Sequence, residues 1–399
     1  MSNSAARLRK ILKTHKTPKL SPQNTPTTIT PIKPISIKEL AEEPDLDELA
    51  KKINHNASIS SKFRSRHNIY DFTIARFSNA ERYNLVEYVL DKHKHFEDIS
   101  REGYALRLIS LYAKAGMFDH AHKLFDELPE LGCPRTVKSF NALLKAAVES
   151  KRFDEVFTLF QGIPADLGIS CDVVSYNTLI HALCEVGKLE EGLLMIDEMK
   201  AKGVNPSVVT FNTLLGAFYR RGFEGGELIW GIMDEYDVVR DIRSYNLKLQ
   251  GLVDEGELEK AVALFESLET KGLKPDVGTF NVFIKKYCDE GDIEEAKRLY
   301  YKLCESCITP NSITFSYLVP KLCDDGEYEL ALDLCKKMFK RQFVVDEALL
   351  QLVVNGLVKE SKIQEAEELV ELGKSNSFVQ YDLVMPSDNT EKQEQNNSP

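Results

Sequence analysis

Several features that define other protein classes are missing from this chain of 399 residues. No run of about 18 or more apolar residues occurs, so a membrane-spanning helix is not expected. The zinc signature of cytosine deaminases, a His-x-Glu followed by Pro-Cys-x-x-Cys, is incomplete, because Pro-Cys-x-x-Cys does not occur and only His95 and Glu97 have the spacing of the first part. The single Cys-x-x-Cys, at Cys304 and Cys307, has no second pair and no nearby histidine, which argues against zinc or redox chemistry. We therefore predict no catalytic residue, metal ligand, cofactor or small-molecule substrate.

The remaining cysteines and histidines also lack the grouping of a ligand set. Cys184, Cys288 and Cys323 recur at one position of a repeated pattern, which predicts small buried thiols in a reducing compartment without disulfides. The eight histidines are scattered, and two close pairs are predicted to be surface pairs rather than ligands: His93 with His95, and His120 with His122.

Acidic residues are lacking at the N-terminus. Residues 1–38 contain eight Lys or Arg and no Asp or Glu, and removing those eight from the 51 basic residues of the chain leaves 43 against 62 acidic ones. Leu8, Ile11 and Leu12 share one helical face among basic residues, and a Ser/Thr/Pro-rich stretch follows. This composition predicts an organellar transit peptide over residues 1–38, mitochondrial rather than chloroplast because the amphipathic stretch begins so early. The alternative is a disordered basic arm that stays attached and contacts phosphate.

One pattern dominates the rest of the chain. An aromatic residue followed by asparagine recurs so that the asparagines are 36, 35, 34 and 35 residues apart: Asn141, Asn177, Asn212, Asn246 and Asn281. Ser316 follows 35 residues later. Glycine keeps the same period at Gly187, Gly222, Gly256, Gly291 and Gly326. A fixed period of this length predicts a solenoid.

Each unit of the pattern predicts two helices. In residues 173–207, Tyr176, Leu179, Ile180 and Leu183 have the spacing of one helical face. Gly187 suits the left-handed residue that ends such a helix, and a second helix is predicted from Lys188 to about Gly203. One hairpin cannot bury both apolar faces alone. We therefore predict an all-α fold, a right-handed α-solenoid of stacked helix-turn-helix repeats of about 35 residues.

The same pattern divides the chain into segments. Residues 39–66 are predicted to form a lead-in helix and a connector, residues 67–376 the repeat array, and residues 377–399 a disordered polar tail. The predicted units are 67–101, 102–136, 137–172, 173–207, 208–241, 242–276, 277–311, 312–346 and a partial unit, 347–376.

Four stretches of the array carry a family resemblance: VVSYNTLI, VVTFNTLL, GELEKAVALFESLETKGLKPD and GDIEEAKRLYYKL. They resemble the consensus of the pentatricopeptide repeat family, and the resemblance extends from residue 67 to about residue 376. The chain resembles the plain type of family member found in plant organelles. Members of that type carry no appended catalytic domain, so the resemblance implies no enzymatic activity. The resemblance implies an organellar protein that binds single-stranded RNA sequence-specifically, one base per repeat, in RNA processing, stability or translation.

The resemblance also implies which residues read the bases. In the family these are the fifth and the last residue of each unit. The implied pairs are Asn141 with Asp172, Asn177 with Ser207, Asn212 with Asp241, Asn246 with Asp276, Asn281 with Asn311, and Ser316 with Asp346. The family's rules translate them into the target 5′-UCUUYG-3′. Asp71 with Arg101 and Leu106 with Thr136 match no rule and stay unassigned.

The residue chemistry allows two interpretations of these pairs. An asparagine amide offers a donor and an acceptor to a pyrimidine edge, and asparagine is a poor residue for a helix interior, so its recurrence requires a cause. The last residues, however, are also good N-caps for the next helix. Capping alone explains the last position but not the asparagines, and base reading is therefore preferred for the pairs as a set.

Two further positions of the family bear on RNA binding. The second residue, which sandwiches the base, is aliphatic at Val174, Val209 and Ile313 but is Lys138, Arg243 and Gly278 elsewhere. The thirteenth, commonly a lysine facing phosphate, is here Glu149, Glu185, Arg220, Asp254, Asp289 and Asp324. Because affinity for RNA comes largely from neutralising phosphates, five acids in six units are expected to weaken binding. Four lysines are either cations that compensate for these acids or ordinary solvated residues: Lys145, Lys285, Lys286 and Lys321.

This acidity keeps a second class of function open. Some short members of the family are subunits of the plant mitochondrial ribosome, where neighbouring proteins hold the array against ribosomal RNA. An acidic array with irregular end units suits a scaffold of that kind. Its partners would be mitochondrial ribosomal proteins and ribosomal RNA.

Overall fold

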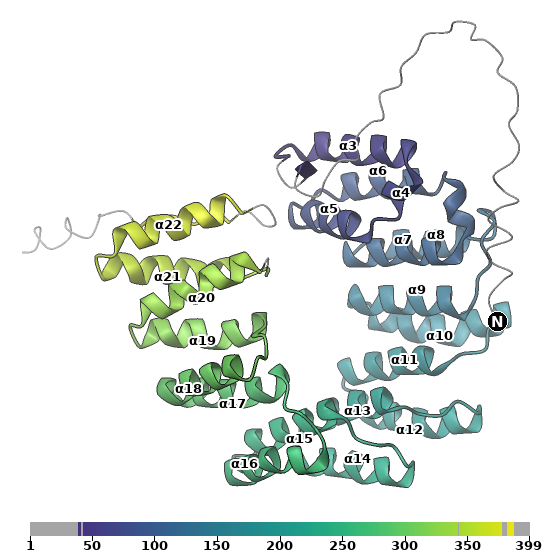
Figure 1. Cartoon of the computed structure of the whole chain (residues 1–399). Helices are drawn as coiled ribbons and strands as arrows, with labels where there is room; N and C mark the ends of the chain where they lie inside the picture. The colour runs from purple at the N-terminus through teal and green to yellow at the C-terminus, as the bar shows by residue number, and fades with distance from the viewer. Residues whose placement is uncertain (1–38, 41–42, 342, 377–380, 387–399) are drawn as a thin grey trace, which may run out of the picture. The chain divides into compact units, whose positions relative to one another are not determined.

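The computed structural model describes residues 39–40, 43–341, 343–376 and 381–386 (Figure 1). Over these ranges the chain is helical and contains no β-strand, which confirms the predicted all-α class. None of the helices in the described ranges is both long and apolar enough to cross a bilayer. The predicted transit peptide, residues 1–38, lies outside the described residues.

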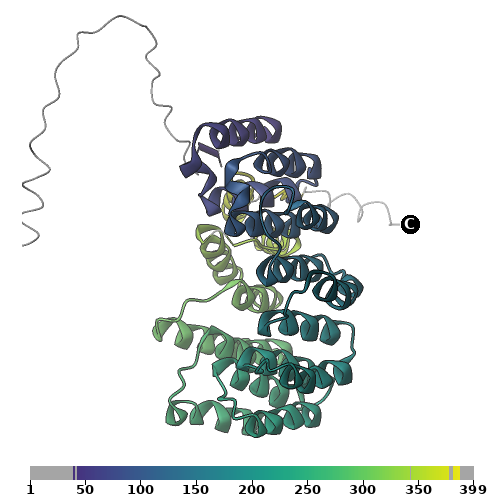
Figure 2. The ribbon, with the colours of Figure 1, turned by 90° about the vertical axis from the view of Figure 1, so that its right-hand side faces the viewer.

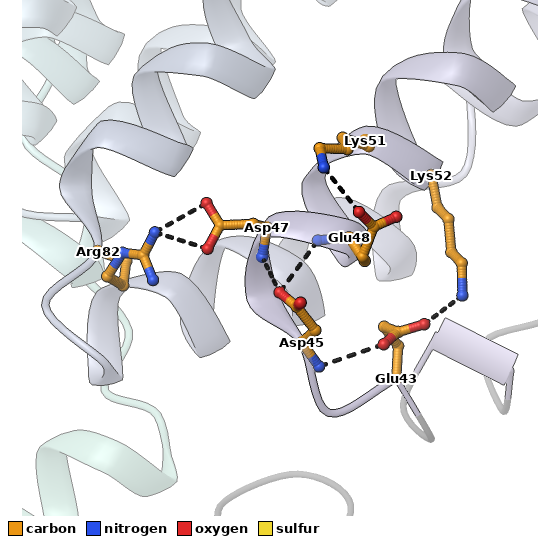
Figure 3. Close-up of polar contacts among 7 residues, drawn as sticks. All are labelled: Glu43, Asp45, Asp47, Glu48, Lys51, Lys52 and Arg82. Carbon is orange, nitrogen blue, oxygen red and sulfur yellow. Dashed lines mark hydrogen bonds and ion pairs between the residues drawn. The ribbon is translucent and has the colours of Figure 1, made fainter.

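Two helices precede the repeats. These are α3 (Leu46–Ile59) and α4 (Ser61–Arg64), and α3 packs against α6 (Tyr83–His93). Asp45 caps α3 by accepting the N–H groups of Asp47 and Glu48 (Figure 3). Arg82, at the start of α6, donates to both carboxylate oxygens of Asp47 at 2.9 Å. The lead-in helix is therefore attached to the first hairpin by an ion pair as well as by its apolar face.

Nine helical hairpins follow within the described residues. Their first helices are α5 (His67–Asn79), α7 (Glu102–Lys114), α9 (Val137–Glu149), α11 (Val173–Glu185), α13 (Val208–Arg221), α15 (Ile242–Asp254), α17 (Val277–Glu290), α19 (Ser312–Asp324) and α21 (Glu347–Lys359). Their second helices are α6, α8 (Phe118–Glu127), α10 (Phe153–Leu167), α12 (Leu189–Ala201), α14 (Phe223–Glu235), α16 (Leu258–Ser267), α18 (Ile293–Glu305), α20 (Tyr328–Lys340) and α22 (Ile363–Lys374). Short 3₁₀ turns lie at Glu97–Ser100 and Glu269–Lys271.

The hairpins stack one on the next through their first helices. Each first helix from α5 to α19 contacts the first helix of the following unit, and each also packs on the second helix of its own unit (Figures 1 and 2). Tyr176, Leu179, Ile180 and Leu183 are all buried, as their spacing predicts. This succession of packed hairpins confirms the predicted solenoid.

The turns inside the hairpins explain the periodic glycines. Gly187 and Gly291 have φ of 79°, a left-handed conformation that glycine adopts without steric cost. Lys151 and Ser361 occupy the matching turns of other units, with φ of 56° and 62°. Gly256 and Gly326 share this conformation, whereas Gly222 at the matching position has φ of 159°. The glycine period therefore marks a left-handed turn in most of these units, and units without the glycine retain it with other residues.

The predicted disordered tail is wrong for residues 381–386, which we call the C-terminal strap. Tyr381 and Leu383 are buried in the same apolar cluster as the last hairpins. The Tyr381 hydroxyl accepts the Val345 N–H at 3.1 Å, and the Tyr381 N–H donates to the Gly373 carbonyl at 3.3 Å. Two apolar side chains two residues apart were too weak a signal to identify this contact. Residues 377–380 and 387–399 lie outside the described ranges.

His93 is not the surface residue that its spacing to His95 predicted. Its ring is buried, lies edge-on to Tyr70 with centroids 4.8 Å apart, and bonds through Nδ1 to the Tyr104 hydroxyl. Burial, reinforced by the positive charges of Arg107 and Arg64, lowers the pKa of His93 to about 3. A histidine that fills a core position gives no periodic signal of its own.

The cysteines follow the prediction. Cys184, Cys288 and Cys323 are buried free thiols, and burial raises the pKa of each, to about 11, 11 and 12 respectively. Cys304 and Cys307 are free and exposed. Within the described ranges, no three or more His, Cys, Asp or Glu side chains are arranged to hold a metal ion.

The buried imidazole of His93 predicts a pH-dependent loss of stability. Its pKa in the folded state lies below that of an exposed histidine, so the unfolded chain binds the proton more readily. Its contribution is complete above about pH 6.5 and is lost as the pH falls toward 3. The measurement is the free energy of unfolding in urea at pH 7 and at pH 4.5, followed by helical circular dichroism. Its decrease between the two pH values should be about 2 kcal/mol smaller in His93→Phe than in the unmodified chain. Equal pH dependence in both proteins would contradict the assignment.

Candidate RNA interface

The fold brings four of the predicted residue pairs into direct contact. In each pair the fifth residue donates its side-chain amide N–H to the last residue of the same unit. The Nδ2 to Oδ1 distances are 2.9 Å for Asn141 to Asp172, 3.0 Å for Asn212 to Asp241, 2.9 Å for Asn246 to Asp276, and 3.1 Å for Asn281 to Asn311. Because an aspartate oxygen only accepts, this bond fixes which end of the amide faces it.

The other end of each amide meets a residue that the sequence analysis did not single out. The third residue of the following unit donates its hydroxyl to the asparagine Oδ1. These donors are Ser175 to Asn141, Thr210 to Asn177, Ser244 to Asn212, Thr279 to Asn246 and Thr314 to Asn281, at 2.6 to 2.8 Å. The signal was present in the sequence, because Ser or Thr stands two residues before the fifth position in each of these units.

The last residue caps the following helix and also bonds to the asparagine of its own unit, while base reading stays a prediction. Asp172 Oδ1 accepts the N–H groups of Val174 and Ser175, at 2.9 and 3.0 Å, and so caps α11. The same oxygen accepts the Asn141 amide. Asp241 does the same for α15 and Asn212. The cap is therefore what places the carboxylate against the amide of its own unit.

These carboxylates are held in the charged form. Burial alone would raise the pKa of Asp172, but hydrogen bonds from the Ser175 N–H and the Asn141 amide outweigh it and lower the pKa below its usual value. The pKa of Asp241 is lowered against its burial by the Ser244 N–H and the Asn212 amide. Each amide N–H is thus bonded to an anion, the stronger class of hydrogen bond.

Two predicted pairs are not joined by a direct hydrogen bond within the described structure. Ser207 caps α13 and contacts the Thr210 hydroxyl, which in turn donates to Asn177. Ser316 is exposed and donates to the Ile313 carbonyl of its own helix, whereas Asp346 caps α21. In these two units the last residue does not orient the fifth directly.

The bonds inside the fold use half of each asparagine amide. One Nδ2 hydrogen and one Oδ1 lone pair are engaged in Asn141, Asn212, Asn246 and Asn281, which leaves one of each free. Access differs between units, since Asn212 and Asn281 expose only 4% and 7% of their surface. The arrangement can present one donor and one acceptor in a fixed orientation to a planar edge.

Apolar side chains flank these amides. Val174, Val209 and Ile313 expose 50%, 55% and 48% of their surface. At Gly278, a Cβ would lie 2.9 Å from the Nδ2 of Asn246, so the second residue of a unit stands directly beside the preceding unit's amide. The space that a side chain at residue 278 would need is occupied by the Asn246 amide and by Asp276 Oδ1, which would lie 3.1 Å from the same Cβ.

The thirteenth positions do not form a basic track. All six side chains are exposed, and three of the five acids pair with lysines that were candidates for compensation. Lys145 pairs with Glu149 at 3.5 Å, Lys285 with Asp289 at 2.9 Å, and Lys321 with Asp324 at 3.4 Å, while Lys286 pairs with Glu290 at 2.8 Å and Arg220 with Glu185 at 3.5 Å. Such exposed pairs are weak, but they cancel the positive charge that phosphate would meet.

Stacked helical hairpins with a polar residue repeated once per unit define a helical repeat protein built for an extended ligand. Family models match the chain in the same places: a PPR repeat family model at residues 171–220, 240–289 and 275–324, and a PPR repeat model at residues 107–133. The chain thus carries repeats of the pentatricopeptide repeat family at these positions, as the resemblance of its repeats predicted.

Individual relatives come from Arabidopsis thaliana. The small ribosomal subunit protein mS78 (rPPR3a) is 49% identical over 145 residues, 36% of this chain and 36% of that protein. The small ribosomal subunit protein mS79 (rPPR3b) is 43% identical over 177 residues, 44% of this chain and 45% of that protein. A mitochondrial pentatricopeptide repeat-containing protein is 34% identical over 254 residues, 63% of this chain and 60% of that protein. The chain thus matches less than two thirds of the length of each of these relatives.

Among solved structures, the pentatricopeptide repeat protein PPR10 from maize is similar to this chain. The alignment covers 87% of this chain and 54% of the PPR10 chain. The sequence identity is 17% and the TM-score is 0.44.

The hydroxyl that meets each asparagine predicts a measurable stability difference. Ser244→Ala removes the donor to the buried Asn212 Oδ1 and should lower the free energy of unfolding by about 1 to 3 kcal/mol. Ser139→Ala is the matched control, because Ser139 makes the same capping box with Thr136 while the preceding unit has Leu106 at the fifth position. Urea unfolding of both variants is the measurement. Equal losses would mean that the bond to the amide contributes nothing beyond the cap.

Proposed function

We propose that this protein binds single-stranded RNA in mitochondria, one base per repeat and without catalysis, in post-transcriptional processing, stability or translation. The observation that carries the proposal is the set of asparagine amides in five consecutive units, each bonded to the last residue of its unit or to the next unit. Mitochondrial relatives support the compartment.

The free half of each amide suits a pyrimidine. Uracil presents an N–H beside a carbonyl on its pairing edge, and an amide with one free acceptor and one free donor can meet both. The exposed Val174, Val209 and Ile313 offer apolar surfaces on which base faces can pack. The proposed target remains 5′-UCUUYG-3′. In this proposal, the bases assigned to Asn141, Asn212, Asn246 and Asn281 hydrogen-bond to amides that the last residue of each unit orients directly.

Asn246 offers a test of this register. Asn246→Ala should reduce the preference for uracil over adenine at the fourth base of 5′-UCUUUG-3′ by about 1 to 3 kcal/mol and leave the preference at the first base intact. Asn141→Ala is the matched control, since it should do the reverse. Fluorescence anisotropy titrations at fixed salt give the affinities. If either variant weakens all RNAs equally, the amides do not read bases.

A second candidate is a structural subunit of the mitochondrial ribosome. The paired acids of the thirteenth positions favour it, because an array whose lysines are already neutralised gains little from phosphate on its own. Neighbouring proteins would then supply the cations and hold the array against ribosomal RNA. The relatives named as ribosomal subunit proteins, mS78 and mS79, support this reading.

Sedimentation of a mitochondrial extract distinguishes the two candidates. A ribosomal subunit should sediment with a ribosomal subunit in a sucrose gradient, in fixed proportion to other ribosomal proteins. A transcript-binding protein should instead sediment in lighter fractions that shift after mild ribonuclease treatment. If the protein stays with the ribosomal subunit after mild ribonuclease treatment, independent transcript binding is rejected. If it sediments in lighter fractions that shift after the treatment, the ribosomal role is rejected.

A further inference from the structure

The C-terminal strap lies along the last first helix, α21, and contacts it through backbone groups. Val384 donates its N–H to Gln351 Oε1 at 2.9 Å, and its carbonyl accepts from Gln351 Nε2 at 2.8 Å. One turn earlier on α21, Glu347 accepts the Asp382 N–H at 3.1 Å. A side-chain amide of the helix is thus paired with both polar groups of a single strap residue.

Gln351 occupies the base-reading position of the last unit. It stands 35 residues after Ser316 and is the fifth residue of the unit that starts at Glu347. Counting onward, Tyr381 takes the last position of that unit and Val384 the third position of a following one. This is where Ser or Thr contacts the amide in the preceding units, so the strap takes the place of a tenth hairpin.

The strap engages the Gln351 amide more completely than a hairpin does. The asparagine amides keep one N–H free, whereas both hydrogens of Gln351 Nε2 are engaged, one by the Val384 carbonyl and one by Asn355 Oδ1 at 2.8 Å. Val384 presents its own backbone N–H and carbonyl to the amide, the same kinds of groups as the edge of uracil. The strap therefore fills this position with a group of the same chemistry as a base.

The strap is held by more than these bonds. Tyr381 and Leu383 are buried on α22 and its neighbours, and a Cβ at Gly373 would lie 2.7 Å from Leu383 Cδ1. Val384, which follows Leu383, exposes its side chain, while its backbone N–H and carbonyl bond to the Gln351 amide. The buried anchors therefore fix the strap in register with Gln351.

We propose that the C-terminal strap ends the RNA track by occupying the base-reading amide of the last unit. The inference rests on the proposed RNA binding and adds the position at which sequence-specific reading of the RNA ends. The base read at Ser316 and Asp346 is the last one, and the nucleotide on its 3′ side is bound without regard to its identity. Displacing the strap from Gln351 adds a seventh readable position.

The test uses the full chain and two proline variants. Val384→Pro removes the N–H and places a ring carbon against Gln351, while Tyr381 and Leu383 keep their anchors. Met385→Pro is the matched control, because no hydrogen bond of its N–H occurs within the described structure. Each protein is titrated with 5′-UCUUUG-3′ extended at its 3′ end by A, C, G or U. Hydrogen exchange at the Val384 amide is measured in parallel.

The expected result is that the unmodified chain and Met385→Pro bind the four extended RNAs with affinities within about twofold of one another. Val384→Pro should separate them by at least about fivefold, and adding Gln351→Ala should abolish that separation. In the unmodified chain the Val384 amide should be protected from exchange, and Gln351→Ala should remove the protection.

Several results would overturn the proposal. An unmodified chain that already discriminates at the seventh base shows that the strap does not close the position. A Val384→Pro variant that binds the six-base core normally without discriminating shows that Gln351 reads nothing. Either outcome leaves the proposed function intact. Equal binding of the core and a scrambled RNA by every variant rejects the proposed function and the strap's role together, whereas an unprotected Val384 amide rejects the strap contact alone.

Discussion

The structure depends on a shared carboxylate oxygen at the start of three central first helices, α11, α15 and α17. In Asp172, Asp241 and Asp276 the same carboxylate oxygen caps a helix and accepts the amide of the preceding fifth residue. Starting a helix and joining it to its neighbour are therefore one interaction. Apolar packing alone tolerates sliding between helices, but a hydrogen bond of 2.9 to 3.0 Å does not, so the polar contact sets the register in which successive hairpins stack.

The same contact gives the candidate interface its character. An asparagine that must satisfy an aspartate on one side and a hydroxyl on the other cannot rotate, so its remaining donor and acceptor point in one direction without a conformational cost at binding. The array thus has well-oriented polar groups but little positive charge, because acids at the thirteenth positions pair with the nearby lysines. Such a surface favours selectivity among bases over strength of binding to phosphate.

The periodic features of the fold were predictable because each repeats many times. The hairpins, the buried positions of residues 176–183 and the three twelfth-position cysteines all follow from a pattern seen in several units. Features that occur once were missed: the burial of His93, and the docking of Tyr381 and Leu383 within a polar tail. For the last residue, base reading was preferred over helix capping. The structure shows that one oxygen caps a helix and accepts the amide of the fifth residue, and base reading stays a prediction.

The sequence by itself determined the helical class, the length of the unit and the residues that recur in it, since these depend on local propensity and spacing along the chain. Only the tertiary structure decided where each polar group ends. That the Asn212 amide meets Ser244 and that Gln351 is paired with Val384 depends on which distant parts of the chain the fold brings within about 3 Å of each other. Hydrogen bonds are short and directional, so the spacing of residues along the chain can suggest them but cannot assign them.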